Sequence, residues 1–291
     1  MATAAVTVKP ISVFADYLSL AKLKSIIPHL VTAAAAMFLA AKGLPVVSTL
    51  VLTLTGGGLV AAASNSLNNY LDRDLDKNML RTDSRPLPSG RLHPSYALLF
   101  SCLSAVAGLI ILGVLVNITT AFLALGALIY YVIVYTLFLK RRTYWSAIIG
   151  SGVGALTPLI GWAAVTNRWS ITPFILSAVI ILWTLPHFWS LAIYRRKDYN
   201  HAGIQTLPPK GPVFWINVCS ILLVSVSIVL VPAAGLNRIY LVAAGVLGGP
   251  FIFLSFLMYN QKSQSSRILH LYSIVYISLL FTAMIIDRLL I

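Results

Sequence analysis

Long apolar runs divide the chain from one end to the other, and they restrict its possible folds more than any other feature. An α-helix needs about 20 apolar residues to cross the hydrocarbon core of a bilayer. Nine runs of this length are present, separated by short segments of turn-forming or charged residues. They lie at roughly 25–41, 46–71, 95–116, 118–139, 144–165, 172–193, 213–234, 238–258 and 268–290. The sequence therefore predicts an all-α integral membrane protein, a bundle of nine transmembrane helices.

The basic residues are distributed unevenly between the two ends of these spans. The chain carries 21 Lys and Arg against 7 acidic residues, a net charge of +14. Of the 21, 17 fall in the N-terminal segment and in the loops after even-numbered spans, and 4 fall on the opposite side. The positive-inside rule then predicts a cytoplasmic N-terminus and a C-terminus outside. Because topology explains the charge, and 59% of the residues are hydrophobic, we expect the lipid bilayer as a partner and no nucleic acid.

The loops between the spans are short, so we expect a single transmembrane domain over residues 1–291, with 1–24 as a cytoplasmic N-terminal segment. The first apolar run begins late and reaches spanning length, and the segment before it lacks Arg. Neither a cleaved signal peptide nor a mitochondrial transit peptide fits that pattern. We therefore expect a multi-pass protein of a bacterial or archaeal cell membrane rather than of the mitochondrial inner membrane. Cys102 and Cys219 lie inside apolar runs, without disulfide or metal-site spacing.

The most polar stretch of the chain, residues 61–91, follows the second span. The chain has no Glu, and four of its seven aspartates gather here: Asp72, Asp74, Asp76 and Asp83. On a helix, Asn68, Asp72 and Asp76 recur every fourth residue and share one face. Side-chain oxygens one turn apart suit a hard divalent cation. A solvated helix end with balancing charges is the alternative, but it has no need for such a row, so the sequence predicts a metal site.

Basic residues that could hold an anion lie close to this row and in a second loop. Arg81 and Arg85 follow it directly, and arginine grips phosphate oxygens. Lys140 and Arg141 follow the fourth span, where topology alone could account for them. An acidic metal site is thus predicted beside a basic anion site, at the mouth of an apolar helix.

A second charged loop follows the sixth span and contains Lys197 and Asp198. Positive-inside topology explains the basic residues but not Asp198, the only acidic residue between Asp83 and Asp287. Two turns earlier, inside the span, His187 is flanked by Trp183, Phe188 and Trp189. An ionisable residue at membrane depth indicates function, and a hydrogen bond to a neighbouring helix is the alternative. We expect His187 to contact a large planar ligand or a cationic intermediate.

These residues together resemble a known family. Asn68-Asn69-x-x-Asp72-x-x-x-Asp76 is similar to the first aspartate motif of the UbiA-type intramembrane prenyltransferases. The longer string LNNYLDRDLDKNMLRTDSRPLPSGR, Trp183-Thr-x-Pro-His187-Phe-Trp and Tyr194-x-x-Lys-Asp198-Tyr resemble one branch, the protohaem IX farnesyltransferases. The resemblance covers about residues 15–290. Asp198 stands alone where the superfamily usually has two aspartates four residues apart, so one or two metal ions could bind.

The resemblance implies a reaction and a set of roles. The substrates are farnesyl diphosphate and haem B, and the products, after addition of one water, are haem O and diphosphate. Mg²⁺ is the implied cofactor, His187 the implied haem contact, and a haem A synthase a candidate partner. The implied metal ligands are Asn68, Asp72, Asp76 and Asp198; the implied catalytic residues are Asp72, Asp76, Lys197 and Asp198; the implied diphosphate contacts are Asn68, Arg81, Arg85, Lys140 and Arg141.

Other functions compete with this interpretation. A UbiA-type enzyme could use another aromatic acceptor, such as a quinone precursor or a chlorin. A transporter would explain buried polar residues, but the charges cluster on one face of the membrane and few lie inside the spans. A scaffold for oxidase assembly would leave the row of aspartates without a purpose.

Overall fold

The computed structural model describes residues 12–78, 82–139, 146–201, 207–208, 211–260 and 263–290. Within these residues, nine helices are long and apolar enough to cross a membrane. They are α2 (Leu23–Ala41), α3 (Val47–Leu71), α5 (Pro94–Ile110) with a π-helical end to Val116, α6 (Ile118–Ile129) with a π-helical end to Leu139, α7 (Ser146–Thr166), α8 (Ile171–Tyr194), α10 (Pro212–Ala234), α11 (Arg238–Phe256) and α12 (Ser263–Leu289). The predicted all-α class and the nine spans are confirmed, with boundaries shifted by a few residues.

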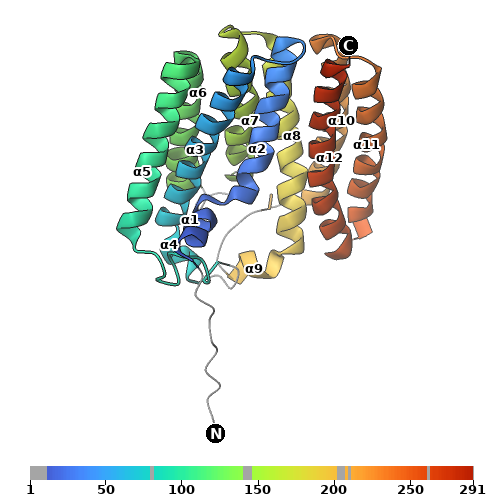
Figure 1. The fold of residues 1–291 in the computed structure, drawn as a ribbon. Helices are drawn as coiled ribbons and strands as arrows, with labels where there is room; N and C mark the ends of the chain where they lie inside the picture. The colour runs from blue at the N-terminus through green and yellow to red at the C-terminus, as the bar shows by residue number, and fades with distance from the viewer. Residues whose placement is uncertain are drawn as a thin grey trace.

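The spans run side by side and pack as neighbours in one bundle (Figure 1). α2 and α8 occupy its middle: α2 packs on α3, α7 and α12, and α8 packs on α7, α10 and α12. Three short helices, α1 (Val13–Ala21), α4 (Arg73–Asp76) and α9 (Arg196–His201), lie toward one end of the bundle, and the C-terminus lies at the other. The prediction that the end with the short helices is cytoplasmic stays a prediction, as does the single domain over 1–291.

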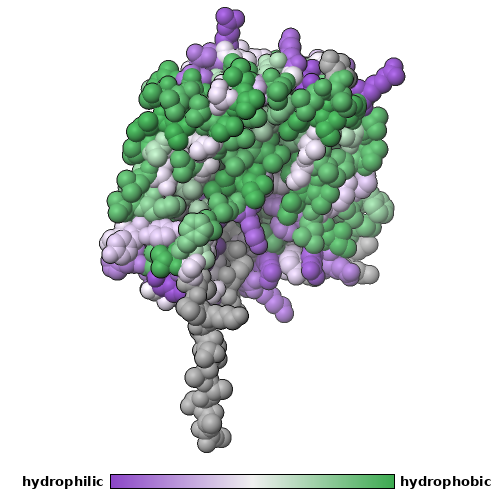
Figure 2. Space-filling view, in the orientation of Figure 1, coloured by the Kyte–Doolittle hydropathy of each residue, from purple (hydrophilic) through white to green (hydrophobic). Residues whose placement is uncertain are grey.

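The outer surface of the bundle matches a bilayer. Hydrophobic residues cover the middle of the face shown in Figure 2, and hydrophilic residues gather toward its two ends. Large apolar side chains such as Val114, Phe122 and Phe253 are well exposed on the outside. An exposed apolar surface of this extent fits hydrocarbon rather than water. The chain is therefore a multi-pass membrane protein.

Small residues let the helices approach closely at two places, as is common between membrane helices. A Cβ placed on Gly161 of α7 would lie 2.3 Å from the carbonyl oxygen of Ala33 in α2. A Cβ on Gly108 of α5 would lie 2.7 Å from the carbonyl oxygen of Gly56 in α3. Because backbone atoms cannot move aside as a flexible side chain can, both contacts require glycine.

We predict that Gly161→Ala destabilises the protein by about 1–3 kcal/mol, since the added methyl group forces α7 away from α2. The matched control is Gly126→Ala in α6, where a Cβ would meet nothing within 4 Å. There the substitution is expected to be neutral or to stabilise the helix by up to about 1 kcal/mol. Unfolding of both variants in detergent measures the difference. Equal stabilities would contradict the close approach of α2 and α7.

Candidate functional site

The end of α3 is tied to the junction between α1 and α2 by two amide side chains. Nδ2 of Asn65 donates to the carbonyl oxygen of Ala21 at 2.9 Å, and Nδ2 of Asn69 donates to that of Leu20 at 2.8 Å. These carbonyls belong to the last turn of α1, where no intrahelical donor reaches them. Asn65 and Asn69 therefore hold the N-terminal helix against the polar end of α3.

The predicted row of Asn68, Asp72 and Asp76 is present and buried, with 3%, 1% and 4% of each residue exposed. α3 ends at Leu71 with Asp72 as its C-cap, yet the amide of Asp76 still donates to the carbonyl of Asp72 at 2.8 Å. The helical spacing is thereby kept across the break between α3 and α4. Such deep burial of two carboxylates is tolerated only if other groups compensate their charge.

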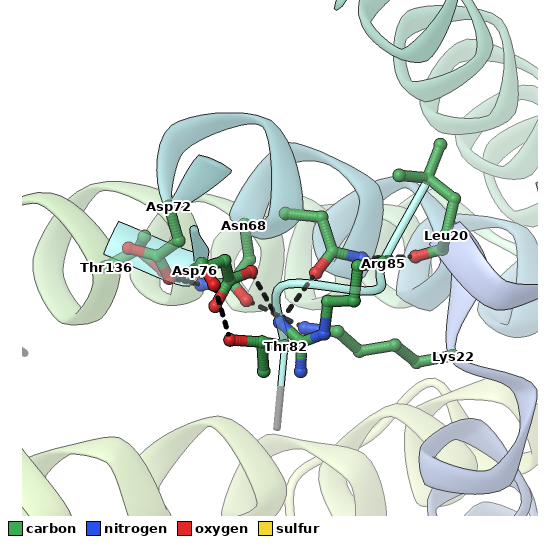
Figure 3. A network of polar contacts seen from close by, with 9 residues as sticks. Leu20, Lys22, Asn68, Asp72, Asp76, Thr82, Arg85 and Thr136 are labelled. Atoms are coloured by element: carbon green, nitrogen blue, oxygen red, sulfur yellow. Dashed lines mark hydrogen bonds and ion pairs between the residues drawn. The ribbon is translucent and has the colours of Figure 1, made fainter. Parts of the chain in front are cut away.

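Asn68 connects the row to its surroundings through both ends of its amide (Figure 3). Its Nδ2 donates to Oδ2 of Asp72 at 2.8 Å and to Oγ1 of Thr136 at 3.1 Å. Its Oδ1 accepts from Nζ of Lys22 at 2.9 Å. Thr136 in turn donates to the carbonyl of Tyr131 at 2.9 Å. The amide is thus oriented by groups from three separate parts of the chain.

Asp76 pairs with one of the predicted anion-binding arginines. Nη1 of Arg85 lies 2.6 Å from Oδ2 of Asp76 and donates to Oδ1 of Asn69 at 3.2 Å. Oγ1 of Thr82 donates to the backbone carbonyl of Asp76 at 3.0 Å. The segment after α4 therefore folds back over the row, and the acidic and basic sites predicted as neighbours are in direct contact (Figure 3).

Lys22 is a member of this site that the sequence reasoning counted only as a topological charge. It separates α1 from α2 in a left-handed conformation (φ 54°), and its side chain reaches Asn68 from that turn. No local pattern marks this lysine, because its partner is 46 residues away in the sequence. Only the packing of α1 against α3 brings the two together.

The second charged loop lies at the same end of the bundle as α4 (Figure 1). In α9, Oδ2 of Asp198 lies 3.5 Å from Nη1 of Arg195, and both side chains are partly exposed. Tyr199 contacts Phe188 of α8, with ring centroids 6.4 Å apart. Lys197 is exposed on α9, and the predicted contacts Arg81, Lys140 and Arg141 lie outside the described residues.

His187 lies on the side of α8 that faces α12. Its ring stacks on Trp183, with centroids 4.7 Å apart, and lies 4.4 Å from the ring of His270. Its Nδ1 is 2.7 Å from Oγ of Ser273, which itself donates to the carbonyl of His270 at 2.6 Å. Because the serine proton is used there, Nδ1 of His187 is the donor and Nε2 carries the free lone pair.

A cavity of about 280 Å³ lies between α2, α3, α6 and α7 and extends from the polar end of α3 into the bundle. Its walls are mainly apolar. Lys22, Ser25 and Asn65 line it near the buried row, and Tyr131 lines it from the π-helical end of α6. Tyr131 stacks on Tyr135, with centroids 5.6 Å apart and planes 15° apart. The cavity thus joins a charged head region to an apolar interior.

The donor set of the buried row fits a magnesium ion. Among the described residues, no group of three His, Cys, Asp or Glu side chains comes together. The oxygens available are the carboxylates of Asp72 and Asp76 and the amide of Asn68. Mg²⁺ is typically held by one or two carboxylates together with waters and substrate phosphates, so these residues suffice if a phosphate completes the shell.

The site therefore consists of a buried acidic row with cationic partners, close to an apolar cavity inside a membrane bundle. The chain belongs to the UbiA prenyltransferase family, whose profile matches residues 29–280. This agrees with the family resemblance that the aspartate motif indicated.

Several curated relatives carry the name protoheme IX farnesyltransferase. The relative from Chloroflexus aurantiacus is 41% identical over 297 residues, which cover all of this chain and 51% of the relative. The relative from Synechocystis sp. is 39% identical over 94% of this chain and 89% of its own length. The chain therefore spans about half the length of the first relatives and most of the length of others.

Solved structures share the fold. The structure of a digeranylgeranylglyceryl phosphate synthase aligns with a TM-score of 0.79 at 17% identity, over 96% of this chain and 99% of that one. A UbiA homologue from Archaeoglobus fulgidus bound to GPP and Mg²⁺ aligns with a TM-score of 0.64 at 16% identity, over 93% and 99%. The bundle is thus of the same type as theirs.

We predict that Arg85→Ala destabilises the protein by about 2–3 kcal/mol, because the buried carboxylate of Asp76 loses its cation while Arg85 itself is only 25% exposed. The matched control is Lys77→Ala, which removes an exposed ion pair with Asp74 at 3.8 Å and is expected to change stability by less than about 0.5 kcal/mol.

Unfolding in detergent solution is measured for both single variants and for the double variant Arg85→Ala, Asp76→Asn. The comparison gives the coupling energy between Arg85 and Asp76. Part of the lost stability returns in the double variant, since the orphaned charge is gone. An Arg85→Ala variant as stable as the wild type would contradict the compensation of Asp76 by this arginine.

Proposed function

We propose that this chain transfers a farnesyl group from farnesyl diphosphate to a vinyl group of haem B, with addition of water, giving haem O and diphosphate. The observation that carries the proposal is the buried row Asn68, Asp72 and Asp76, flanked by Lys22 and Arg85 at the mouth of the apolar cavity. A charged head and an apolar chain would each find a matching environment there. The shared name of the curated relatives supports haem as the acceptor.

The cations around the row are suited to the diphosphate. Lys22 and Arg85 already face the buried oxygens, so they are placed to pair with an incoming diphosphate. Further candidates for its oxygens are Lys197 on α9, Arg81, Lys140 and Arg141. Asn68, Asp72 and Asp76, with Asp198 as a further candidate ligand, would hold Mg²⁺, which would supply positive charge to offset that of the leaving diphosphate.

The interior of the site is suited to an allylic cation. As the bond between C1 and the diphosphate oxygen lengthens, positive charge develops on the farnesyl carbons. The stacked rings of Tyr131 and Tyr135 lie beside the row, and an aromatic face attracts such a charge. The apolar walls exclude bulk water, which protects the cation from premature hydrolysis.

His187 is our candidate for contact with haem. Because its Nδ1 donates to Ser273, its Nε2 is the nitrogen with a free lone pair, the form that binds iron. The adjacent Trp183 ring, stacked on His187, holds the imidazole in its orientation. The vinyl terminal carbon would then attack C1 of the farnesyl group as diphosphate leaves, and water would add to the resulting cation beside the porphyrin ring.

The setting that follows is a bacterial or archaeal cell membrane, with the site at the cytoplasmic face. Farnesyl diphosphate is water-soluble at its head, so a site at the membrane end admits it from the aqueous side. A haem A synthase, which consumes haem O, is the candidate partner.

Mass spectrometry of porphyrins made by purified protein from haem B, farnesyl diphosphate and Mg²⁺ tests the proposed reaction. We expect a product heavier than haem B by one farnesyl group and one water. If haem B returns unchanged while a quinone precursor or a chlorin is prenylated, the acceptor is wrong but the family chemistry holds. A gradient-dependent solute flux without any product would favour a transporter.

We predict that Asp72→Asn and Asp76→Asn each lower turnover by at least about 100-fold, because each removes a charged oxygen from the buried row. Asp74→Asn is the matched control, since Asp74 is exposed on the same short helix. Turnover is measured by release of diphosphate, and insertion and folding by size-exclusion chromatography in detergent. If Asp72→Asn or Asp76→Asn turned over at the wild-type rate, the proposal that these aspartates bind a metal would be wrong.

A further inference from the structure

His29 is a histidine inside the bundle that the proposed reaction has not used. It lies on α2, one turn after Ser25 and two turns after Lys22, and it lines the same cavity as both. His29 is exposed, although the helix α2 as a whole packs against α3, α7 and α12. Its ring also reaches α7, where Cε1 lies 3.7 Å from the position of a Cβ on Gly154. The exposed surface of the ring therefore faces the cavity.

The imidazole of His29 has no hydrogen bond, ion pair or ring contact among the described residues. Other histidines of the described chain are engaged: His187 and His270 with each other and with α12, and His93 with the amide of Ser95. Because His29 is exposed toward the cavity, its ring nitrogens are open to a ligand or a reacting water there.

Few groups in this cavity could accept a proton. Among the described residues that line it, the titratable side chains are Lys22, His29 and Tyr131. Lys22 is engaged as a cation with Asn68, and a neutral phenol is a very weak base. The imidazole of His29 is the side chain among these three that offers a basic nitrogen not already engaged by a neighbour.

The proposed reaction needs such a base. In it the vinyl terminal carbon forms a bond to C1 of the farnesyl group, the C1–O bond breaks, and diphosphate leaves with the electron pair. The neighbouring vinyl carbon becomes cationic, and a water oxygen bonds to it. One proton of that water must then be lost to give the neutral hydroxyl product. We propose, resting on the function proposed above, that His29 is the catalytic base that takes this proton.

The position of His29 along α2 matches the order of the reacting atoms. In an in-line attack the reacting groups follow one another in a fixed order: the leaving oxygen, C1, the two vinyl carbons, the water and the base. The distance from the leaving oxygen to the base is then on the order of 10 Å. His29 follows Lys22 by seven positions, which on a helix corresponds to a rise of about 10 Å. The base thus lies at the depth where the water would be, on the side of the vinyl carbons remote from the diphosphate.

The test compares His29→Ala, His29→Gln and His29→Leu with wild type and with the control His93→Ala, which alters only a surface cap of α5. Wild type and His93→Ala are expected to form the hydroxylated product at equal rates. His29→Ala and His29→Gln are expected to form it about 100-fold more slowly, with the KM for farnesyl diphosphate within threefold of wild type. Added imidazole is expected to raise the rate of His29→Ala at least tenfold. It is not expected to raise the rate of His29→Leu, because the leucine side chain fills the space left by the histidine ring.

The outcomes separate this inference from the function on which it rests. If wild type makes no farnesylated porphyrin, the proposed function fails first, and the role of His29 fails with it. If wild type is active and His29→Ala stays within threefold, His29 is not the base and the leaving diphosphate takes the proton. The proposal would also be overturned if His29→Ala is slow, unfolds at the same temperature as the wild type and is not rescued by imidazole.

Discussion

The compensation of two buried carboxylates is the interaction on which the rest of this site depends. Asp72 and Asp76 are almost fully enclosed at the end of a membrane helix, where an unpaired charge is expensive. The amide of Asn68, held by the ammonium of Lys22, satisfies one carboxylate, and the guanidinium of Arg85 satisfies the other. These contacts fix the position of α1 and of the segment after α4. The same contacts keep the oxygens of Asn68, Asp72 and Asp76 in one row, with the side chains of Lys22 and Arg85 beside them.

The membrane helices supply the frame in which this compensation is possible. Glycine contacts, such as that between Gly161 and Ala33, bring α2 and α7 close together, while the apolar outer face satisfies the bilayer. Between α2, α3, α6 and α7 a cavity remains that is apolar over most of its length. The two charged segments α4 and α9 lie at one end of the bundle. The cavity runs from polar side chains near the buried row, those of Lys22, Ser25 and Asn65, to mainly apolar walls, an arrangement that suits an amphiphile.

Along α2 the side chains that face the cavity follow the same gradient. Lys22 lies at the charged end, Ser25 one turn deeper, and His29 a further turn into the apolar part. His187 lies apart from this line, in a ring cluster between α8 and α12. The two histidines therefore occupy different parts of the bundle, and the roles proposed for them are separate.

The all-α membrane class, the nine spans and the row at the end of the second span could be predicted from the sequence alone. Those features follow from periodicity and local spacing, because a helix fixes which residues share a face and how long an apolar run must be. The partners of the row could not be predicted in this way, because they depend on how the helices pack. Lys22 meets Asn68 across 46 residues, and His29 faces a cavity formed by four helices, so neither contact leaves a local pattern. Such contacts arise from how helices pack, and packing depends on side chains that are distant in the sequence.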